Sequence, residues 1–481
     1  MVRTPARQAS SQAGRTLLLG VAGLFLLVTL PVVVAGQPLA DDYHTCLRPT
    51  QVGLDGFLGE SWRRMGAVRP ARFVEIFMIA PLCQRMPYGV VILVPLALTL
   101  LVGLLLRGLL RDLDLPPPWP EVGAALWLLH PLGTEAALWP SALHVPLGLA
   151  LALVALRLYR RGRHAWAAAA TVAACLSVEI VLAFPLAAWM ASPPEQRRRA
   201  VAITTGIALV LVPAYALWPG TDPRSAVALT DRVVAVFSDL GWYVRFPAAG
   251  LGLHSIALAI WWAFPASIAI LGLGGWVGGR FGPRLLGDGP AAAPPPRRTL
   301  VRWAAAGAAL VALVNVPLIV TLPRGHTPRT FTPTWLILAA LVPVAASRVR
   351  WRRPRLVGAA AGLFAAAALL SLALSVSVRL ETAEFNQAAT RYLAGRIADG
   401  GIVAVCGVPR TVATPAPVGS FALHEFAYDW AAEDAMRYYT GRDADVRLGG
   451  PMWGTGCPDR TGADLVVGFD ELRRAAAEGT P

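Results

Sequence analysis

Lysine is absent from this chain of 481 residues, so all 43 of its basic residues are arginine. Charge of either sign is scarce, because 15% of the residues are charged whereas 56% are hydrophobic. An ordinary soluble enzyme carries more charge and less apolar sequence than this. The composition therefore excludes an ordinary soluble enzyme and indicates a protein that is largely embedded in a membrane.

Several signatures of nucleotide and metal chemistry are missing as well. The sequence contains no glycine-rich phosphate-binding loop, no zinc-ligand spacing and no nucleophile elbow. It also shows no internal repeat. The use of a nucleotide-sugar at the inner face of a membrane is therefore disfavoured.

Apolar runs of about 20 residues, the length needed to cross a bilayer, recur along the chain. We therefore predict a polytopic α-helical membrane protein with about 11 transmembrane helices. The first run follows Arg3, Arg7 and Arg15 and is longer than the apolar core of a signal peptide, which indicates a signal anchor. The predicted spans are residues 16–36, 88–106, 116–130, 143–158, 165–177, 179–191, 199–218, 248–272, 301–322, 334–347 and 356–378.

The arginines are distributed unevenly between the loops that join these spans. If the N-terminus is cytoplasmic, the inside loops contain basic clusters such as "RLYRRGRH" and "RVRWRRPR", and the outside segments contain most of the acids. This distribution obeys the positive-inside rule, so the net charge of +14 is a topology signal rather than a sign of nucleic-acid binding. Arginine as the sole basic residue and abundant alanine are typical of a GC-rich bacterial genome, which points to a bacterial inner (plasma) membrane.

Two external loops and one internal segment have distinctive patterns. The external loop 37–87 is too long for a simple connector, and its stretches 53–66 and 69–82 mix apolar residues with arginine at helical spacing. We predict two short amphipathic helices there, lying on the outer leaflet, and a further amphipathic stretch in the external loop 218–247. The proline- and glycine-rich segment 279–298 is predicted to be an inside linker.

The composition changes at about residue 381, where acids, tyrosine, histidine and glycine increase and no further span follows. The stretch "GGIVAVCGVP" predicts a buried strand, "HEFAYDWAAEDAMRYYTG" a helix that ends at Gly441, and "ADLVVGFDEL" another strand. We therefore predict a transmembrane module, residues 1–380, followed by a small extracytoplasmic C-terminal α/β domain, residues 381–481.

Asp41 and Asp42 stand side by side just after the first span. A carboxylate that is fixed beside its substrate is suited to act as a general base. A second carboxylate next to it raises the pKa of the first, or the pair binds a divalent cation such as Mg²⁺ or Mn²⁺, although the sequence does not require a metal. The alternative for both acids is a solvated loop that caps a helix or turn.

Other polar residues are predicted at the same outer surface. The stretch between the third and fourth spans contains His130, Glu135 and His144, and Glu179 lies at the outer turn between the fifth and sixth spans. Acids at or inside a membrane are costly and usually functional. The alternative for the histidines is a packing or interfacial role, and for the glutamates a helix-terminal or turn position that faces lipid headgroups.

A cationic cluster is predicted in the external loop between the ninth and tenth spans. It contains Arg324, His326 and Arg329. The guanidinium fork of arginine matches the oxygen atoms of a phosphate. Acids that face these cationic groups across the outer interface would suit a lipid-phosphate substrate whose head is transferred there. Loop arginines that contact lipid headgroups are the alternative.

Four of the five cysteines are predicted to lie outside, Cys46 and Cys83 in the first loop and Cys406 and Cys457 in the C-terminal domain. An oxidising compartment would allow two disulfides. Spacing alone does not fix the connectivity, and four unpaired thiols are the alternative.

Together these features resemble the GT-C superfamily of membrane glycosyltransferases, which take a sugar from a polyprenyl-phosphate carrier. The motif "DDY", Asp41 to Tyr43, is similar to the acidic motif in the first external loop of the family, and "HPLGTEAALWPSALH" resembles its P…E…W segment. The stretch "LSVEIVLAFPL" is similar to a serine-lysine-glutamate segment, although Val178 stands where lysine is usual. "TPRTFTPTWL" resembles the external arginine segment before a late span, which points to Arg329.

The resemblance implies an inverting sugar transfer at the outer face of the membrane. Asp41 or Asp42 would be the base, and Arg329, with Arg324 or His326, would hold the leaving phosphate. The donor would be a polyprenyl-phosphate sugar, and the acceptor a lipid-linked glycan, a cell-wall polymer or a protein. The C-terminal domain would cover the site or bind the acceptor.

Two other classes of function fit part of the sequence. A transporter or lipid flippase would explain the spans and the buried acids, but no paired broken helices occur at matching positions in two halves. A non-catalytic scaffold of the cell envelope would use the C-terminal domain as a binding module, and Asp41 and Asp42 would then be replaceable.

Overall fold

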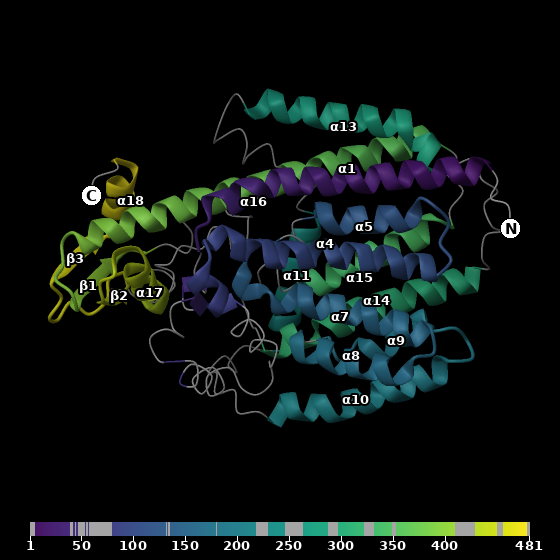
Figure 1. Cartoon of the computed structure of the whole chain (residues 1–481), viewed down its shortest axis with the longest axis horizontal. Helices are drawn as coiled ribbons and strands as arrows, with labels where there is room; N and C mark the ends of the chain where they lie inside the picture. Colours follow the sequence, from purple (N-terminus) through teal and green to yellow (C-terminus); the bar gives the residue numbers. More distant parts are fainter. Residues whose placement is uncertain are drawn as a thin grey trace.

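The computed structural model is a bundle of helices with a small α/β domain at one end (Figure 1). It describes the residues 5–38, 42, 43, 45, 46, 53, 56, 79–130, 132, 135–178, 180–217, 229–245, 263–286, 297–321, 331–348, 353–408, 429–449 and 456–478.

The bundle is made almost entirely of α-helices, as its apolar runs predict. Two short 3-10 helices, η1 and η2, connect α5 to α7. The elements are α1 (Pro5–Ala35), α4 (Tyr88–Asp112), α5 (Trp119–Leu129), η1 (Glu135–Ala137), η2 (Pro140–Ala142), α7 (His144–Arg160), α8 (His164–Ser177), α9 (Phe184–Ala191), α10 (Arg197–Leu217), α11 (Leu229–Arg245), α13 (Ala263–Leu286), α14 (Arg297–Thr321), α15 (Thr332–Ala346) and α16 (Pro354–Ala394).

Four helical segments of the described chain are long and apolar enough to cross a membrane. They are Ser11–Ala35, Tyr88–Asp112, Pro140–Arg160 and Pro354–Ala394. Three shorter apolar helices, His164–Ser177, Val301–Pro317 and Thr332–Ala346, fall below that length. A membrane protein is therefore indicated, whereas the count of eleven spans stays a prediction.

A described helix extends beyond the end of the eighth predicted span, the first part of which lies outside the described residues. Helix α13 begins at Ala263 and continues to Leu286, beyond the predicted range 248–272, so the first residues of the predicted linker 279–298 are helical. The glycines that suggested a flexible linker have a packing role instead. A Cβ atom on Gly278 or Gly282 would collide with the backbone of Gly358 on α16.

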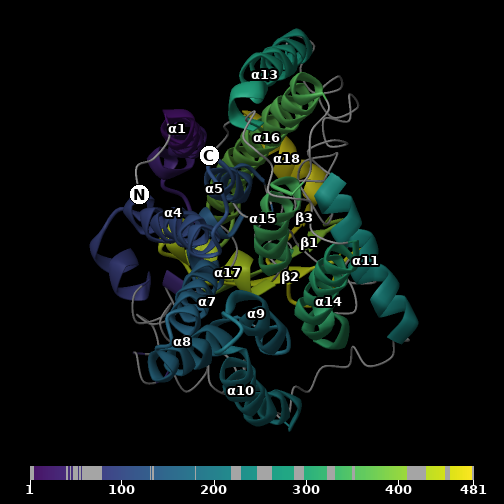
Figure 2. The same cartoon turned by 90° about the vertical axis from the view of Figure 1, so that its right-hand side faces the viewer.

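Helices α13 and α16 lie side by side in both views (Figures 1 and 2). The contact is formed by glycines at four-residue spacing, which place their backbones against each other: Gly274, Gly278 and Gly282 on α13, and Gly358 and Gly362 on α16. Small residues at this spacing let helices approach closely enough for van der Waals packing to hold them together in lipid.

Basic residues gather at the end of the bundle that contains the N-terminus, which we call the arginine end. Glu121 is fully buried there and is bound by the guanidinium groups of Arg107 and Arg111. Arg157 pairs with Asp112 at 2.7 Å, and thereby ties the end of α7 to the end of α4.

The opposite end of the bundle, from which the α/β domain projects, is called the domain end. Here α1 and α4 approach each other at Gly36 and Gly89. Gly36 has a positive φ of 57°, and a Cβ atom on Gly89 would collide with the Val33 carbonyl. The close approach of these helices fixes the point at which the chain leaves α1, and it places Tyr88 beside the loop that follows.

The C-terminal domain contains a parallel three-stranded sheet in the order β2-β1-β3. The strands are β1 (Gly401–Cys406), β2 (Ala444–Leu448) and β3 (Leu465–Gly468), and the helices are α17 (Asp429–Thr440) and α18 (Phe469–Glu478). The structure places strands at "GGIVAVCGVP" and "ADLVVGFDEL" and a helix that ends just before Gly441, as the sequence predicts. Strand β2 was not predicted, because its sequence, "ADVRL", alternates charged with apolar residues and is short.

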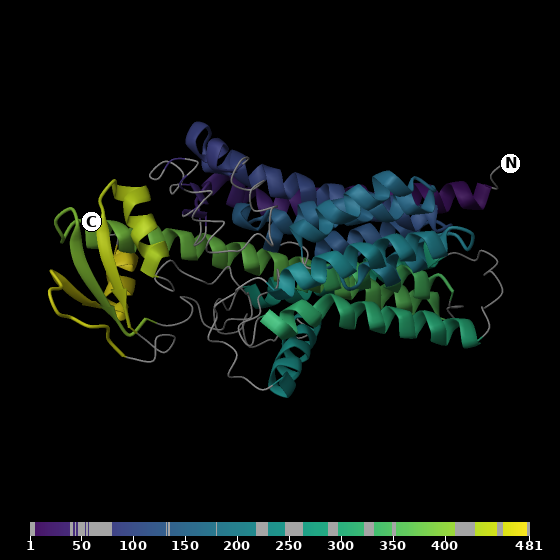
Figure 3. The same cartoon turned by 90° about the horizontal axis from the view of Figure 1, so that it is seen from below.

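Helix α16 joins the two parts of the molecule without a break. It is 41 residues long, so the predicted boundary at residue 380 falls inside it. Its last turns bury Phe385, Ala389 and Leu393 in the core of the α/β domain. The domain therefore projects from the bundle on a continuous helix (Figure 3).

Other predicted helices fall partly outside the described residues. Helix α11 lies within the external stretch that was predicted to be amphipathic. Residues 79–85, at the end of the second predicted helix of the first loop, are helical. The rest of the two loop helices, 53–66 and 69–78, lies outside the description apart from the isolated residues 53 and 56.

Candidate functional site

Asp42 is buried at the domain end of the bundle, where 1% of its surface is exposed. Asp42, Tyr43, Thr45 and Cys46 are helical, so Asp42 and Cys46 lie on one face, and both are buried. The Oδ1 atom of Asp42 accepts a hydrogen bond from the backbone N–H of Ser141 in η2 at 3.0 Å. The carboxylate of the first loop is thus bound by the segment that the sequence predicted to lie at the same surface.

Arg379 is the cationic partner of Asp42. Its Nη2 atom lies 4.0 Å from Oδ2 of Asp42 and donates to the Gln37 carbonyl at 3.4 Å. Arg379 is itself 1% exposed, on the face of α16 that packs into the bundle. Charges that are removed from water are stable only when they are paired, so the two residues depend on each other.

Three buried hydroxyl groups lie near this pair on the same elements. They belong to Tyr88 at the start of α4, Ser141 in η2, and Thr382, one turn beyond Arg379 on α16. The hydroxyls of Tyr88 and Ser141 are close enough to the Asp42 carboxyl to lower its pKa. Buried polar groups are almost always satisfied in proteins, and here the carboxylate, the guanidinium and these hydroxyls stabilise one another.

Two opposing effects act on the pKa of the Asp42 carboxyl. Burial raises the pKa of this carboxyl above its usual value, since a charge is less stable away from water. Arg379 acts against this and lowers the pKa, and so do the nearby Tyr88 and Ser141 hydroxyls and the Ser141 N–H. The burial effect is the larger one, so Asp42 takes up a proton more readily than an exposed aspartate.

Tyr43 connects the site to the C-terminal domain. Its ring is fully buried and packs edge-on against Tyr438 and Tyr439 of α17, with centroid distances of 5.5 and 5.8 Å. The hydroxyls of Tyr43 and Tyr439 are 3.0 Å apart. The predicted "DDY" motif therefore binds the bundle through its second residue and the α/β domain through its third.

A second polar cluster surrounds His130. This histidine is fully buried and stacks on Trp335 of α15 with ring centroids 3.9 Å apart, and its Nδ1 accepts from the N–H of Leu132 at 3.1 Å. Thr332 donates to the Leu132 carbonyl at 2.6 Å. These contacts pack His130 between α15 and the segment before η1, and its predicted role in a site stays a prediction.

The structure shows less about the other predicted residues of this segment. His144 is buried and begins α7, and Glu135 begins η1, although its side chain is not among those described. Five predicted site residues lie outside the described residues: Asp41, Glu179, Arg324, His326 and Arg329. Their roles stay predictions. The start of α15, just after Arg329, nevertheless lies against the His130 segment through Thr332.

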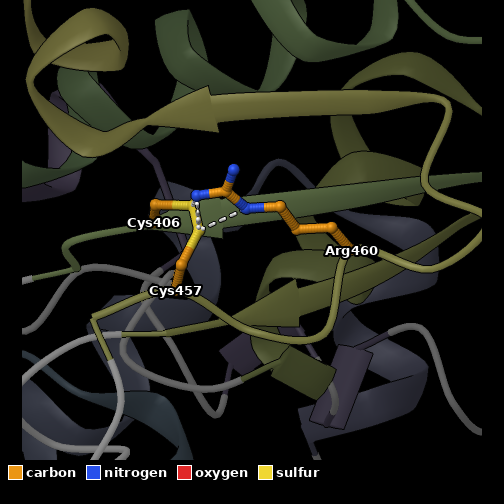
Figure 4. The surroundings of a disulfide bond; sticks show 3 residues. All are labelled: Cys406, Cys457 and Arg460. Atoms are coloured by element: carbon orange, nitrogen blue, oxygen red, sulfur yellow. Dashed lines mark hydrogen bonds between the residues drawn. A yellow bond between two sulfur atoms is a disulfide. The ribbon is translucent and has the colours of Figure 1, made fainter.

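The structure joins the four predicted external cysteines in two pairs, Cys46 with Cys83 and Cys406 with Cys457. The first pair fastens the helical residues around Asp42 to the chain just before α4. The second lies at the carboxyl end of β1, where Arg460 contacts Cys457 Sγ through Nε at 3.2 Å (Figure 4). Cys175, in α8, is buried and takes part in neither of these disulfides.

The described residues offer no ready metal site. Among them, no group of three or more histidine, cysteine, aspartate or glutamate side chains lies close enough to hold an ion. The charged partner of Asp42 is the guanidinium of Arg379, 4.0 Å away, whereas Asp41, the other half of the predicted carboxylate pair, lies outside the described residues.

Sequence reasoning missed several residues of this site. Arg379 was counted as one external arginine among many, although a signal was present. Buried polar residues recur along α16 at spacings of three or four, which is typical of a helix face turned toward a polar interior. They are Ser371, Ser375, Arg379, Thr382, Asn386 and Thr390.

The sequence contains no such signal for two other sets of contacts. These are the contacts of Asp42 with Tyr88 and Ser141, and those of Tyr43 with the tyrosines of α17. Each joins residues that are distant in sequence, and no local sequence pattern predicts them.

Comparison of the chain with protein family models, with curated proteins and with solved structures finds no match.

Proposed function

We propose that this protein is a membrane glycosyltransferase that moves a sugar from a polyprenyl-phosphate donor to an extracytoplasmic acceptor with inversion. The observation that supports this proposal is the setting of Asp42. A loop carboxylate is held inside the domain end of a helix bundle, next to a buried cation and buried hydroxyls. A fixed carboxylate with a raised pKa is suited to general-base catalysis.

In the proposed reaction, a hydroxyl of the acceptor donates its proton to Asp42 as its oxygen attacks the anomeric carbon of the donor sugar. A new glycosidic bond forms, the bond from that carbon to the phosphate oxygen breaks, and the phosphate leaves with the electron pair. Because one displacement occurs at the anomeric carbon, its configuration inverts. The proton remains on Asp42 until it is released to water.

Arg379 has a role that is separate from binding the leaving group. It lies 4.0 Å from Asp42, so it is positioned to keep the base ionised in a buried site. Stabilisation of the departing phosphate is assigned to Arg329, with Arg324 or His326, as the family resemblance implies. A divalent cation at Asp41 and Asp42 is not needed for this scheme.

The orientation of the protein is part of the same proposal. The arginine end would face the cytoplasm by the positive-inside rule, so that Asp42 and the C-terminal domain would face outward from a bacterial plasma membrane. The two cysteine pairs at the domain end are consistent with an oxidising compartment.

The alternative function is that of a lipid transporter, which is also compatible with a buried ion pair. Its substrate site would be expected near the middle of the membrane, between discontinuous helices. Asp42 and Arg379 instead lie at the domain end, beside the close approach of Gly36 and Gly89, which favours chemistry at a membrane surface over passage through it.

The deciding experiment measures sugar transfer from a panel of labelled polyprenyl-phosphate sugars by the full-length protein in nanodiscs. Asp42→Asn retains an oxygen for the Ser141 N–H but removes the base, so we expect transfer to fall by about 10²–10⁴-fold while donor binding is retained. Asp41→Asn, in parallel, tests the other predicted base.

The control is Asp114→Asn, an exposed acid that pairs with Arg160 at the arginine end and should leave transfer unchanged. If the wild type binds no such donor, and both Asp41→Asn and Asp42→Asn still complement a deletion strain, the enzyme proposal is wrong.

A further inference from the structure

Three tyrosines from distant parts of the chain form one cluster at the domain end. Tyr43 follows Asp42, and Tyr438 and Tyr439 occupy the last turn of α17. Each ring meets the other two edge to face, with centroid distances of 5.2 to 5.8 Å. We call these three residues the tyrosine cluster.

Exposure changes across the tyrosine cluster. Tyr43 has no exposed surface, whereas Tyr438 keeps 37% of its surface exposed. Tyr438 is also close to the catalytic carboxylate that we propose, because its ring packs on that of Tyr43, the residue that follows Asp42. The cluster therefore extends from the surface of the protein to the buried acid.

The same helices position the acid and the exposed ring. Helix α17 packs on α16 and β2, and buries Ala432, Ala435 and Met436 against the core of the α/β domain. Helix α16 provides Arg379, the partner of Asp42. The turn that contains Asp42 is held beside these two helices by Arg379 and by the contact of Tyr43 with Tyr438, which fixes the acid near the exposed ring, as a substrate subsite requires.

A simple contact between domains would not explain this arrangement. Packing between the bundle and the domain is already provided by Tyr43 and Tyr439, whose hydroxyls are 3.0 Å apart. Tyr438 adds a large ring that stays partly exposed, and a partly exposed aromatic ring beside a site is typical of ligand recognition.

A sugar ring fits these surroundings better than a peptide does. One face of a pyranose or furanose presents C–H groups that stack on an aromatic ring, and its rim presents hydroxyls that can donate to a carboxylate. The tyrosine cluster combines a partly exposed ring, that of Tyr438, with the residue next to the buried Asp42, so a sugar ring on Tyr438 would lie close to the acid.

We propose that Tyr438, supported by Tyr43 and Tyr439, binds a sugar ring of the acceptor, so that the acceptor is a glycan rather than a protein. The assignment of this ring to the acceptor rests on the proposed function. The binding of a glycan at Tyr438 does not, and it can be measured without any transfer reaction.

Binding is tested first, with the full-length protein in nanodiscs on an array of immobilised hexose, pentose and amino-sugar oligosaccharides. We expect wild type and Tyr438→Phe to bind, and Tyr438→Ala to bind about tenfold more weakly, because the ring and not the hydroxyl makes the contact. Val466→Ala removes an exposed apolar side chain from β3, on the sheet edge away from β2, and should bind as wild type does.

Thermal unfolding shows whether Tyr438→Ala is folded, and Tyr438→Leu, which keeps an apolar side chain without an aromatic face, replaces it if it is not. Wild type that binds no glycan, or variants without the ring that bind as strongly as wild type, would overturn the proposal.

The transfer assay then separates the two proposals. With a saturating polyprenyl-phosphate donor, Tyr438→Ala should raise the KM for a glycan acceptor about tenfold and leave the KM for the donor unchanged. An unchanged acceptor KM in an active enzyme, or transfer to peptides alone, overturns the role of Tyr438 but not the proposed function. Glycan binding through Tyr438 without any transfer overturns the function and leaves the glycan site in place.

Discussion

At the scale of single residues, burial and Arg379 act on the Asp42 carboxyl in opposite directions. Burial raises its pKa and the guanidinium lowers it. The proposed base must be ionised, so activity should fall as the pH drops through the pKa of Asp42. Replacement of Arg379 by methionine removes the lowering effect, and the acidic limb of the kcat/KM profile should then move up by about one to three pH units.

Arg379→Lys is the matched control for this prediction. It keeps a cation on the same helix position, so it should restore most of the original pH profile, even though lysine lacks the planar fork that reaches Gln37. If Arg379→Met folds, binds donor and keeps an unshifted acidic limb, then Asp42 is not the group whose ionisation limits the reaction.

The residues of this site differ in how far sequence can predict them. Asp42 was proposed because a pair of acids directly after an apolar run is conspicuous, and Tyr43 because it completes the "DDY" motif of the resemblance. Arg379 has a local pattern, the buried polar face of α16, but that pattern is visible only once the orientation of the helix is known. Tyr88 and Ser141 have none, because their role depends on the loop that folds back between them.

At the scale of elements, the close approach of α1 and α4 sets the geometry of the first loop. A Cβ atom on Gly89 would collide with the Val33 carbonyl, so Gly89→Ala must separate the two helices at the domain end. Tyr88 and the Asp42 turn would then shift relative to each other. We expect transfer to fall by about a hundredfold, because a displacement near 1 Å is enough for such a loss.

Gly23→Ala is the control for Gly89→Ala, since a Cβ atom at Gly23 of α1 meets nothing within 4 Å. Both variants are compared by transfer rate and by thermal unfolding. Equal transfer rates in the two variants would mean that the approach of α1 to α4 does not position the site.

The glycine contact between α13 and α16 makes a prediction about stability rather than activity. In Gly278→Leu, the new side chain would meet the backbone of Gly358, and overpacking of this kind costs about 1–3 kcal/mol. Gly272→Leu, on the same helix, faces open space and should change stability little. Denaturation in detergent of the two variants measures the difference, and equal midpoints would contradict the close packing.

This pair of helices also shows what local sequence rules miss. Glycine and proline after residue 278 indicated a linker, because glycine is usually a sign of flexibility. In a membrane helix the same residue permits close backbone contact, and the distinction depends on a partner that is 80 residues away in sequence. The helices that pack through larger side chains, such as α4 and α7, were placed correctly from their apolar runs.

At the scale of the whole molecule, the continuous helix α16 connects the bundle to the C-terminal domain and packs in the core of that domain. The predicted change of composition near residue 381 is real, but the polypeptide stays helical across it for a further 14 residues, to Ala394. The composition of a segment reflects whether lipid or water is predicted to surround it. It does not report where a helix ends, because polar residues such as Glu381 and Glu384 are compatible with a helix on either side of the boundary.

The orientation of the molecule can be predicted from its two ends and tested directly. The arginines that pair with Glu121, Asp112 and Asp114 lie at one end of the bundle, and the α/β domain lies at the other. The orientation of one span across the membrane therefore decides on which side each end lies. The positive-inside rule predicts that the arginine end is cytoplasmic. We therefore expect an impermeant maleimide to label Val466→Cys, in exposed β3, in intact cells, and to label Arg163→Cys only after permeabilisation.

The native cysteines give this measurement a low background, because four of them are paired and Cys175 is buried. The reverse labelling pattern would place Asp42 and the tyrosine cluster on the cytoplasmic side. A donor whose sugar faces outward would then be unable to reach the site, so that result would contradict the proposed orientation and the proposed source of the sugar together.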